Sequence, residues 1–259
     1  MKLTVIENQM RYFVLLKEVV KRDIKKKYYK SALGIIWTVL DPLLHMLVLA
    51  FVFNTIFQRS IDNFPIYVLC GRLTFGFITG SGSRGLSAIT SNAGVIRSMY
   101  VPKYIFVLSR VTEAFVDLMF SLIALFLVML VTGAPITPYL LMLPVLFILE
   151  FMFALGLALI LATYGTFLRD LAYLYNIFTL LLHWLCALFY PITIIPTTYR
   201  FVFDLNPIYQ YITIMRSICH EGVAPTEKSL IIGTCYAVLM LAMGISVFKS
   251  KENKFFLYV

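Results

Sequence analysis

One stretch, residues 22–57, limits what this chain can fold into, because a dense group of cations runs directly into a long apolar segment. The apolar part, residues 33–57, contains a single acid, Asp41. A helix of ~20 residues is enough to cross the ~30 Å hydrocarbon core of a bilayer. Lysine and arginine stay preferentially on the cytoplasmic side, so we predict that residues 33–57 span a membrane and lead outward from the cytoplasm. The cations in front of this span are Arg22, Lys25, Lys26, Lys27 and Lys30.

The composition extends this prediction to the whole chain. Hydrophobic residues make up 61% of it, and its mean hydropathy is +0.88, values typical of an integral membrane protein rather than of a soluble domain. The net charge of +9 could indicate a nucleic-acid partner. The cations flank apolar segments, however, where they set the topology and lie beside anionic lipid. We therefore expect membrane lipid, and no nucleic acid, next to these charges.

Six apolar segments predict six membrane spans. A span must pair its backbone groups internally, and segments of this length do so as helices, so the predicted fold class is an all-α integral membrane protein. An even number of spans places both basic termini in the cytoplasm, including a tail at 249–259. The predicted spans are residues 33–57, 64–84, 104–132, 139–165, 172–194 and 229–248.

Three further segments are too polar or too short to span. Residues 1–32 alternate apolar and charged residues with helical period, which predicts an amphipathic helix on the cytoplasmic membrane surface that contacts either lipid or a partner. Residues 86–99 form a second cytoplasmic segment. The outer region 195–228 contains an apolar part that is too short to cross, and we predict a re-entrant or interfacial pair of helices there.

Ionisable residues occur inside two of the predicted spans. Arg110, Glu113 and Asp117 share one helix face in the cytoplasmic half of the third span, and Glu150 lies near the middle of the fourth. Such residues face the bundle interior or water and often mark ion pathways. A relay should continue deeper into the membrane, whereas this group stops. We therefore interpret it as a mutually neutralised structural cluster, with a proton or ion relay as the alternative.

Sequence motifs for catalysis and nucleotide binding are absent. The chain contains no GxxxxGK[ST] loop, no HExxH and no GxSxG. We expect a protein that is not an enzyme, with no metal and no cofactor of its own. The three histidines, His45, His183 and His220, are far apart in sequence. Cys70 and Cys219 could both lie near the outer face, which leaves a disulfide between them open.

Three blocks of sequence resemble a known family. They are KYYKSALGIIWTVLDPLL at 27–44, SNAGVIRSMYVPK at 91–103, and a group of short motifs that joins RDL at 169–171, YP at 190–191, NPIYQYI at 206–212 and Arg216. In this order they resemble the permease subunits of ABC transporters that export lipid-linked polysaccharides such as O-antigen, teichoic acid and capsule. The resemblance covers essentially the whole chain.

The resemblance implies a half-channel in the bacterial cytoplasmic membrane. Two copies would form the conduit, and two separate ATPase subunits would bind ATP and Mg²⁺ beneath it. Helix 6–30 and segment 86–99 would contact those subunits. The glycan would hang from a polyprenyl pyrophosphate, whose charge the cations of residues 22–30 could attract. The candidate residues for the ATPase contact are Ser91, Asn92, Ile96 and Arg97.

Aromatic residues in the first and fifth spans suit a sugar conduit, because aromatic rings stack on the apolar faces of sugars. Packing inside the bundle or an interfacial belt is the alternative. The candidate lining residues are Trp37, Tyr175, Phe178, Trp184 and Tyr190.

Three other functions remain open at this stage. An ABC exporter of drugs or small amphiphiles would need no site for a polyprenyl phosphate. A proton-coupled secondary transporter would use Glu113, Asp117 or Glu150 and should show an internal repeat, which we do not find convincingly. A membrane scaffold for glycan-synthesis enzymes would tolerate loss of the aromatic residues.

Overall fold

A computed structural model describes residues 2–29, 31–55, 61–98 and 101–258 of the chain, with the side chains of 2–11, 54–55 and 257 left aside. Across this part of the chain the regular structure is helical, without strands, which confirms the all-α class. The elements are α1 (Lys2–Tyr28), η1 (Gly34–Ile36), α2 (Trp37–Thr55), α3 (Phe64–Leu86), η2 (Thr90–Asn92), α4 (Ala93–Ser98), α5 (Tyr104–Thr132), η3 (Pro138–Met142), α6 (Leu143–Phe167), α7 (Leu171–Leu185), η4 (Ile192–Ile194), η5 (Thr197–Tyr199), α8 (Arg200–Asp204), α9 (Pro207–Arg216), η6 (Ser217–Glu221, a π-helix), α10 (Glu227–Lys251) and η7 (Glu252–Leu257).

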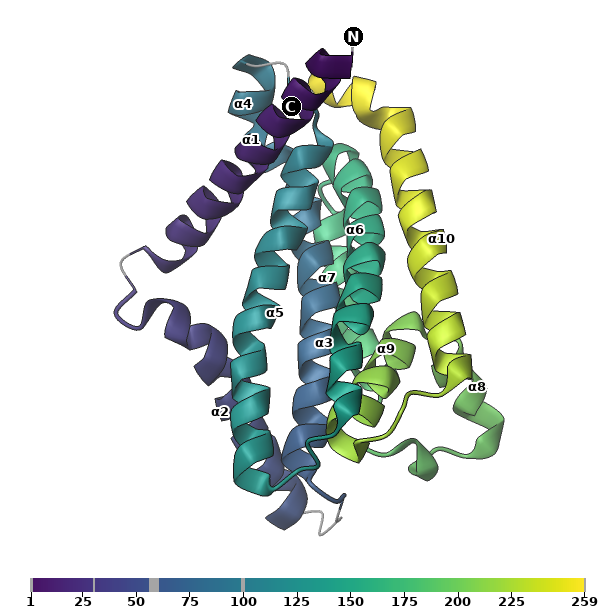
Figure 1. Ribbon diagram of the computed structural model, residues 1–259. Helices are drawn as coiled ribbons and strands as arrows, with labels where there is room; N and C mark the ends of the chain where they lie inside the picture. Colours follow the sequence, from purple (N-terminus) through teal and green to yellow (C-terminus); the bar gives the residue numbers. More distant parts are fainter. Residues whose placement is uncertain (1, 30, 56–60, 99–100, 259) are drawn as a thin grey trace.

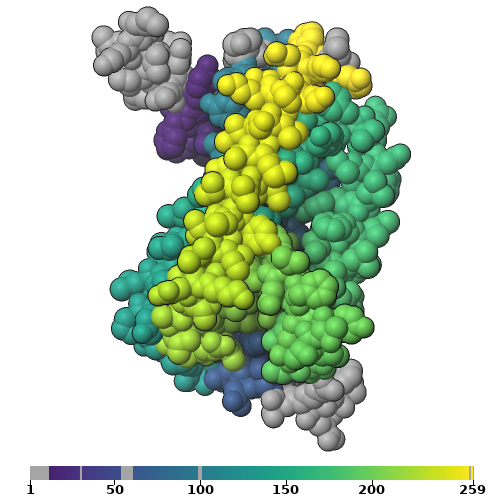
Figure 2. Space-filling view, turned by 90° about the vertical axis from the view of Figure 1, so that its right-hand side faces the viewer, coloured from purple at the N-terminus to yellow at the C-terminus, as the bar shows by residue number. Residues whose placement is uncertain are grey.

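Helix α3 is the centre of the bundle. It packs against α2, α5, α6, α7 and α9, and α10 packs against the far side of α6 (Figure 1). Helix α1 leans against α5, begins at the end of the bundle where α10 finishes, and leads toward α2 at the side (Figure 1). Figure 2 shows α10 crossing one face of the bundle diagonally above the α8–α9 region. The two ends of the described chain therefore lie at the same end of the bundle.

Four helices are long and apolar enough to cross a membrane: Gly34–Phe53, Tyr104–Thr132, Pro138–Phe167 and Glu227–Phe256. They correspond to the first, third, fourth and sixth predicted spans. Helix α3 has 23 residues but falls outside this group in apolarity. Most residues of α3 are buried against other helices, so the helix can contain glycines, serines and threonines that would be unfavourable against lipid. A central helix therefore gives a weak hydropathy signal.

Helix α7 is shorter than the predicted span 172–194. It is apolar but only 15 residues long and ends at Leu185. Ala187 has a φ of 47°, in the left-handed region where a helix cannot continue, and Pro191 follows. The boundary prediction was wrong because this turn is a local backbone feature inside an apolar sequence. The count of six spans stays a prediction, and so does the re-entrant character of 195–228, where the structure has the short helices α8, α9 and η6.

Helices α6 and α10 cross with their backbones almost in contact. A Cβ atom added at Gly244 would lie 2.4 Å from the carbonyl oxygen of Gly156, and one added at Gly156 would lie 2.3 Å from the carbonyl oxygen of Met240. Small residues at a crossing allow this approach, and dispersion contacts then replace the hydrophobic effect that is missing between helices in lipid. The crossing sets where α10 can lie on the bundle.

Candidate functional site

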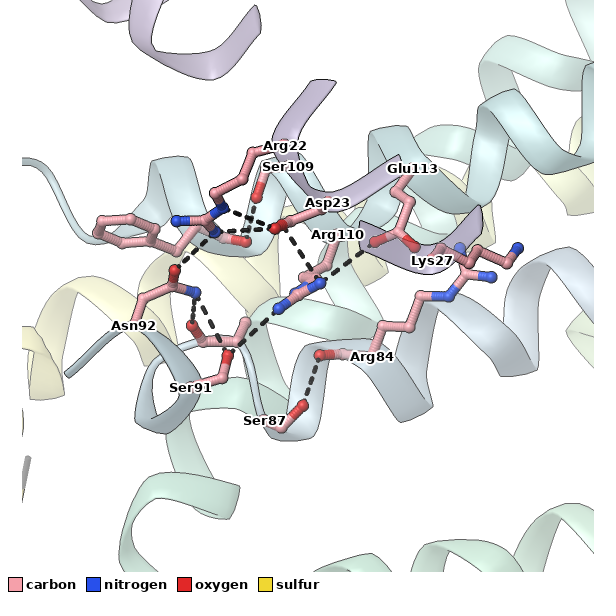
Figure 3. A network of polar contacts seen from close by, with 12 residues as sticks. Arg22, Asp23, Lys27, Arg84, Ser87, Ser91, Asn92, Ser109, Arg110 and Glu113 are labelled. Atoms are coloured by element: carbon pink, nitrogen blue, oxygen red, sulfur yellow. Dashed lines mark hydrogen bonds and ion pairs between the residues drawn. The ribbon is translucent and has the colours of Figure 1, made fainter. Parts of the chain in front are cut away.

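A polar network ties three elements together at the end of the bundle where the termini lie (Figure 3). Arg22 of α1 donates to Asn92 Oδ1 of η2 at 3.0 Å and pairs with its neighbour Asp23 at 2.8 Å. Arg110 of α5 pairs with the same Asp23 at 3.2 Å and with Glu113 at 3.3 Å. Asp23 and Glu113 are buried, and a buried charge is tolerated when it is paired. The network thus fixes α1, η2 and α5 relative to one another.

The four candidate coupling residues do not share one environment. Asn92 is 4% exposed and Ile96 is 7% exposed. Asn92 Nδ2 donates to Ser91 Oγ at 3.3 Å, and Arg110 also donates to that hydroxyl at 3.4 Å (Figure 3). Ser91 and Arg97 are exposed. In this conformation, Asn92 and Ile96 hold the segment against its own chain, while Ser91 joins the polar network at its exposed edge and Arg97 is exposed.

A second node forms around Asp117 of α5. Its Oδ2 accepts from Lys27 of α1 at 2.7 Å and from Arg84 of α3 at 2.6 Å, and its Oδ1 accepts from the Tyr28 hydroxyl at 3.1 Å. Burial raises the pKa of the Tyr28 phenol above its ordinary value, so the hydroxyl keeps its proton and donates. One carboxylate therefore joins the end of α1 to the two helices at the core of the bundle.

The structure divides the predicted charge cluster. Arg110 pairs with Glu113, as the i, i+3 spacing predicts, whereas Asp117 pairs with cations from α1 and α3. Glu150 is separate: it is buried in α6, and its Oε1 accepts from Thr74 of α3 at 2.9 Å. Among the described residues, no hydrogen bond or ion pair links Glu150 to the other three. A continuous proton path through them is not part of this arrangement.

Replacing Asp117 by asparagine should destabilise the chain by ~1–3 kcal/mol, because the amide accepts more weakly and leaves Lys27 and Arg84 close together without a compensating charge. Thermal unfolding in detergent measures this loss of stability. Asp41→Asn is the matched control, since Asp41 also pairs with an arginine, Arg72, but its side chain is 68% exposed and such pairs contribute less than ~1 kcal/mol. Equal losses in the two variants would contradict the role of Asp117.

Asp117 lies in the wall of a cleft of about 600 Å³. The cleft runs between the end of α1, α2, α3, α5 and α7, and its lining combines three cations and two acids with aromatic and aliphatic side chains. Trp37, which is 47% exposed, lines it as well. The charged and aromatic lining residues include Lys27, Trp37, Asp41, Arg72, Phe75, Arg84, Asp117 and Phe189.

The five candidate conduit aromatics are scattered. Of the five, Trp37 alone lines the cleft among the described residues. Phe178 and Trp184 are exposed on the outward face of α7. Tyr175 is 6% exposed and donates to the carbonyl oxygen of Thr79 at 2.9 Å, which makes it a packing residue in this chain. Tyr190 donates to the carbonyl oxygen of Trp184. Contact of any of them with a glycan stays a prediction.

The five candidate cations for the pyrophosphate differ in the same way. Arg22 is bonded to Asn92 in the polar network, and Lys27 is paired with Asp117. Lys25 and Lys26 are exposed on α1. Lys30 lies outside the described residues. Sequence reasoning missed Asp23 and Arg84. The only available signal for Asp23 was an acid placed within a run of cations.

Arg216, at the end of α9, is buried at the opposite end of the bundle. Its guanidinium donates to the carbonyl oxygens of Ala187 at 3.0 Å and Leu188 at 3.1 Å, and it lies 3.5 Å from the ring centroid of Tyr67 in α3. Tyr67 in turn donates to the carbonyl oxygen of Tyr190 at 2.8 Å. Arg216 therefore holds the turn after α7 against α3 and α9. All four cysteines are free, and Cys70 and Cys219 are buried.

Comparison with known proteins gives matches along most of the chain. A family model described as ABC-2 type transporter matches residues 14–219. The chain is 27% identical over 247 residues to the O-antigen export system permease protein RfbA of Myxococcus xanthus, with 95% of each chain covered. It is 23% identical over 244 residues to RfbA of Klebsiella pneumoniae, with 94% of each covered. It is also 23% identical over 236 residues to the polysialic acid transport protein KpsM of Escherichia coli, with 90% of this chain and 91% of that protein covered.

Proposed function

Because this chain belongs to the ABC-2 type transporter family, we propose that it is the permease subunit of an ATP-driven exporter of a polyprenyl-pyrophosphate-linked polysaccharide. The observation that carries the proposal is similarity along nearly the entire chain to permeases named for O-antigen and polysialic acid. Two copies of the chain form the conduit in the bacterial cytoplasmic membrane. ATP and Mg²⁺ are bound by two separate ATPase subunits.

The proposed topology has six spans and both termini in the cytoplasm. The common position of the start of α1 and the end of α10 supports an even number of crossings (Figure 1). Helix α3 crosses inside a shell of other helices, and α7 crosses only part of the bilayer before the outer turn at Ala187. Helices α8 and α9 then form the outer re-entrant region. The proposed spans are α2, α3, α5, α6, α7 and α10.

The proposed ATPase contact is the outward face of the segment η2–α4 together with α1. Gly94 and Arg97 of α4 are exposed. In the adjoining η2, Asn92 accepts a hydrogen bond from Arg22 of α1. Ser91 accepts hydrogen bonds from both Asn92 and Arg110 of α5, and so connects this segment to α5. A force applied to α4 by a closing ATPase therefore reaches α1 and α5 through paired charges rather than through a flexible loop.

The proposed substrate site is the cleft between α2, α3, α5 and α7. Three cations face two acids in its lining, where Lys27, Arg72 and Arg84 would attract the pyrophosphate. Trp37 offers an aromatic face to the first sugars. The exposed Lys25 and Lys26 extend the positive charge along α1 toward the membrane surface. Proton-coupled transport is not favoured, because Glu113 and Asp117 are paired with cations and Glu150 bonds to Thr74.

Co-expression with a candidate ABC-type ATPase, sought first among the coding regions next to this gene, tests the proposal. We expect a complex that hydrolyses ATP. Gly94→Arg should reduce both the amount of co-purified ATPase and the rate of hydrolysis at least about tenfold, because a loss of about 1.4 kcal/mol in binding free energy lowers the affinity tenfold. An added Cβ at Gly94 meets nothing within 4 Å, so the chain itself should fold normally. Lys254→Glu, exposed on η7 at the same end, is the matched control. A chain that binds no ATPase and moves solute down a proton gradient would contradict the proposal.

A further inference from the structure

A groove of about 580 Å³ lies on the side of the bundle, between the start of α5, the middle of α6 and the end of α10. It shares no lining residue with the cleft proposed for the substrate. Its lining residues Leu155 and Ile245 are the chain neighbours of Gly156 and Gly244, where α6 and α10 cross. The walls below the rim are apolar and consist of Leu108, Leu155, Leu159, Ile245 and Phe248.

The rim of this groove is cationic. Lys103 donates to the carbonyl oxygen of Glu252 at 2.5 Å and lies 5.8 Å from the ring centroid of Phe255, which leaves further ammonium protons available. Lys249 is exposed and makes no hydrogen bond or ion pair with the part of the chain that the structure describes. Both lysines stand where the apolar runs of α5 and α10 meet the polar ends of the helices. The groove lining therefore contains two cations and one acid, Glu252, at a position that the proposed topology places among the lipid headgroups.

We propose that this groove binds an anionic phospholipid of the cytoplasmic leaflet. The phosphate lies between Lys103 and Lys249, and an acyl chain follows the apolar wall toward the α6–α10 crossing. An occupant with an anionic head and an apolar tail matches the order of charges and apolar side chains along the groove, which a second protein helix with a uniformly apolar face does not. Because Val101 and Pro102, which lie between α4 and α5 in the chain, line the groove, the bound lipid also contacts the connection from the proposed coupling segment to α5.

Lipid selectivity at the groove tests this proposal. The reporter is Tyr104→Trp, at the groove wall, in a background with Trp37→Phe and Trp184→Phe, so that its fluorescence is the only indole signal. The protein is reconstituted into vesicles that contain brominated phosphatidylglycerol or brominated phosphatidylcholine. The extent to which each lipid quenches the tryptophan fluorescence gives the ratio of their affinities for the groove. We expect phosphatidylglycerol to bind about five- to tenfold more strongly, because a lysine near the surface contributes a factor of about five. A ratio near one would overturn the proposal.

Lysine variants test whether the preference for phosphatidylglycerol arises at this groove. Lys103→Ala/Lys249→Ala should bring the ratio close to one, whereas Lys251→Ala/Lys254→Ala, which removes the same charge outside the groove, should leave it unchanged. An equal loss in both would assign the preference to diffuse surface charge and overturn the site. Lys249→Glu alone covers the case in which the double variant fails to fold, and it should lower the ratio at least about fivefold. Displacement of phosphatidylglycerol by a lower concentration of a polyprenyl phosphate would assign the groove to the transported lipid instead.

Discussion

Replacing Arg216 by methionine should destabilise the chain by ~3–5 kcal/mol, which lowers the Tm by roughly 10 °C for a chain of this size. The side chain is 6% exposed, and its guanidinium supplies the hydrogen bonds to the carbonyl oxygens of Ala187 and Leu188. Methionine fills the space without a donor, so the carbonyl of Leu188 loses the hydrogen bond from the guanidinium, and that of Ala187 keeps only the 3.4 Å hydrogen bond from the Tyr67 hydroxyl. A buried carbonyl left without a partner costs ~1–3 kcal/mol. The contact with the Tyr67 ring, worth up to ~2 kcal/mol when desolvated, is lost as well.

Thermal unfolding in detergent and the amount of exported polysaccharide measure this effect together. Arg200→Met is the matched control, because Arg200 also donates to two backbone carbonyls, those of Ile195 at 3.0 Å and Thr193 at 3.3 Å. Its site is partly exposed, so water can replace the lost bonds and the change should stay near ~1 kcal/mol. Similar Tm values for the two variants would show that Arg216 does not hold the turn after α7.

Replacing Gly244 by leucine should prevent α10 from packing in its native position. Even the first added atom would lie 2.4 Å from the carbonyl oxygen and 2.7 Å from the Cα atom of Gly156. These are backbone atoms of a helix in the bundle, and they cannot move aside as the end of a side chain can. Overpacking commonly costs ~1–3 kcal/mol, and this substitution should exceed that range because α10 itself must be displaced.

A graded series makes the test specific. Gly244→Ala should lower the Tm less than Gly244→Leu, and both should lower it more than Gly80→Ala. Gly80 lies in α3, and an added Cβ there meets nothing within 4 Å, so alanine should stabilise that helix by up to ~1 kcal/mol. Unfolding in detergent gives the order of the three variants. An unchanged Tm for Gly244→Leu would mean that the contact between α6 and α10 does not contribute to stability.

The apolar helices could be predicted from sequence with good boundaries. The third predicted span, 104–132, has the same limits as α5, and the sixth, 229–248, lies within α10. Hydropathy succeeds here because a lipid-facing helix must be apolar along its whole length, which is a local property of the chain. It fails for α7, whose end at Leu185 depends on a turn that Arg216 holds from α9.

Charge pairing was predictable only where both partners lie on one helix. The spacing of Arg110 and Glu113 predicted their pair. The same reasoning placed Asp117 in that cluster, whereas the structure pairs it with Lys27 and Arg84. A helix face is defined by the sequence period, but the neighbour that meets this face depends on how separate helices pack.

The sequence by itself determined that the chain is an all-α membrane protein, which segments are apolar, and, through its motifs, which transporter family it resembles. Each of these follows from local composition, spacing or motif. The tertiary structure decided that α3 is the central helix, that Asp117 joins α1 to α3 and α5, and that Arg216 holds the outer turn. These contacts connect residues far apart in the chain, and their geometry comes from close helix packing, which no single segment encodes.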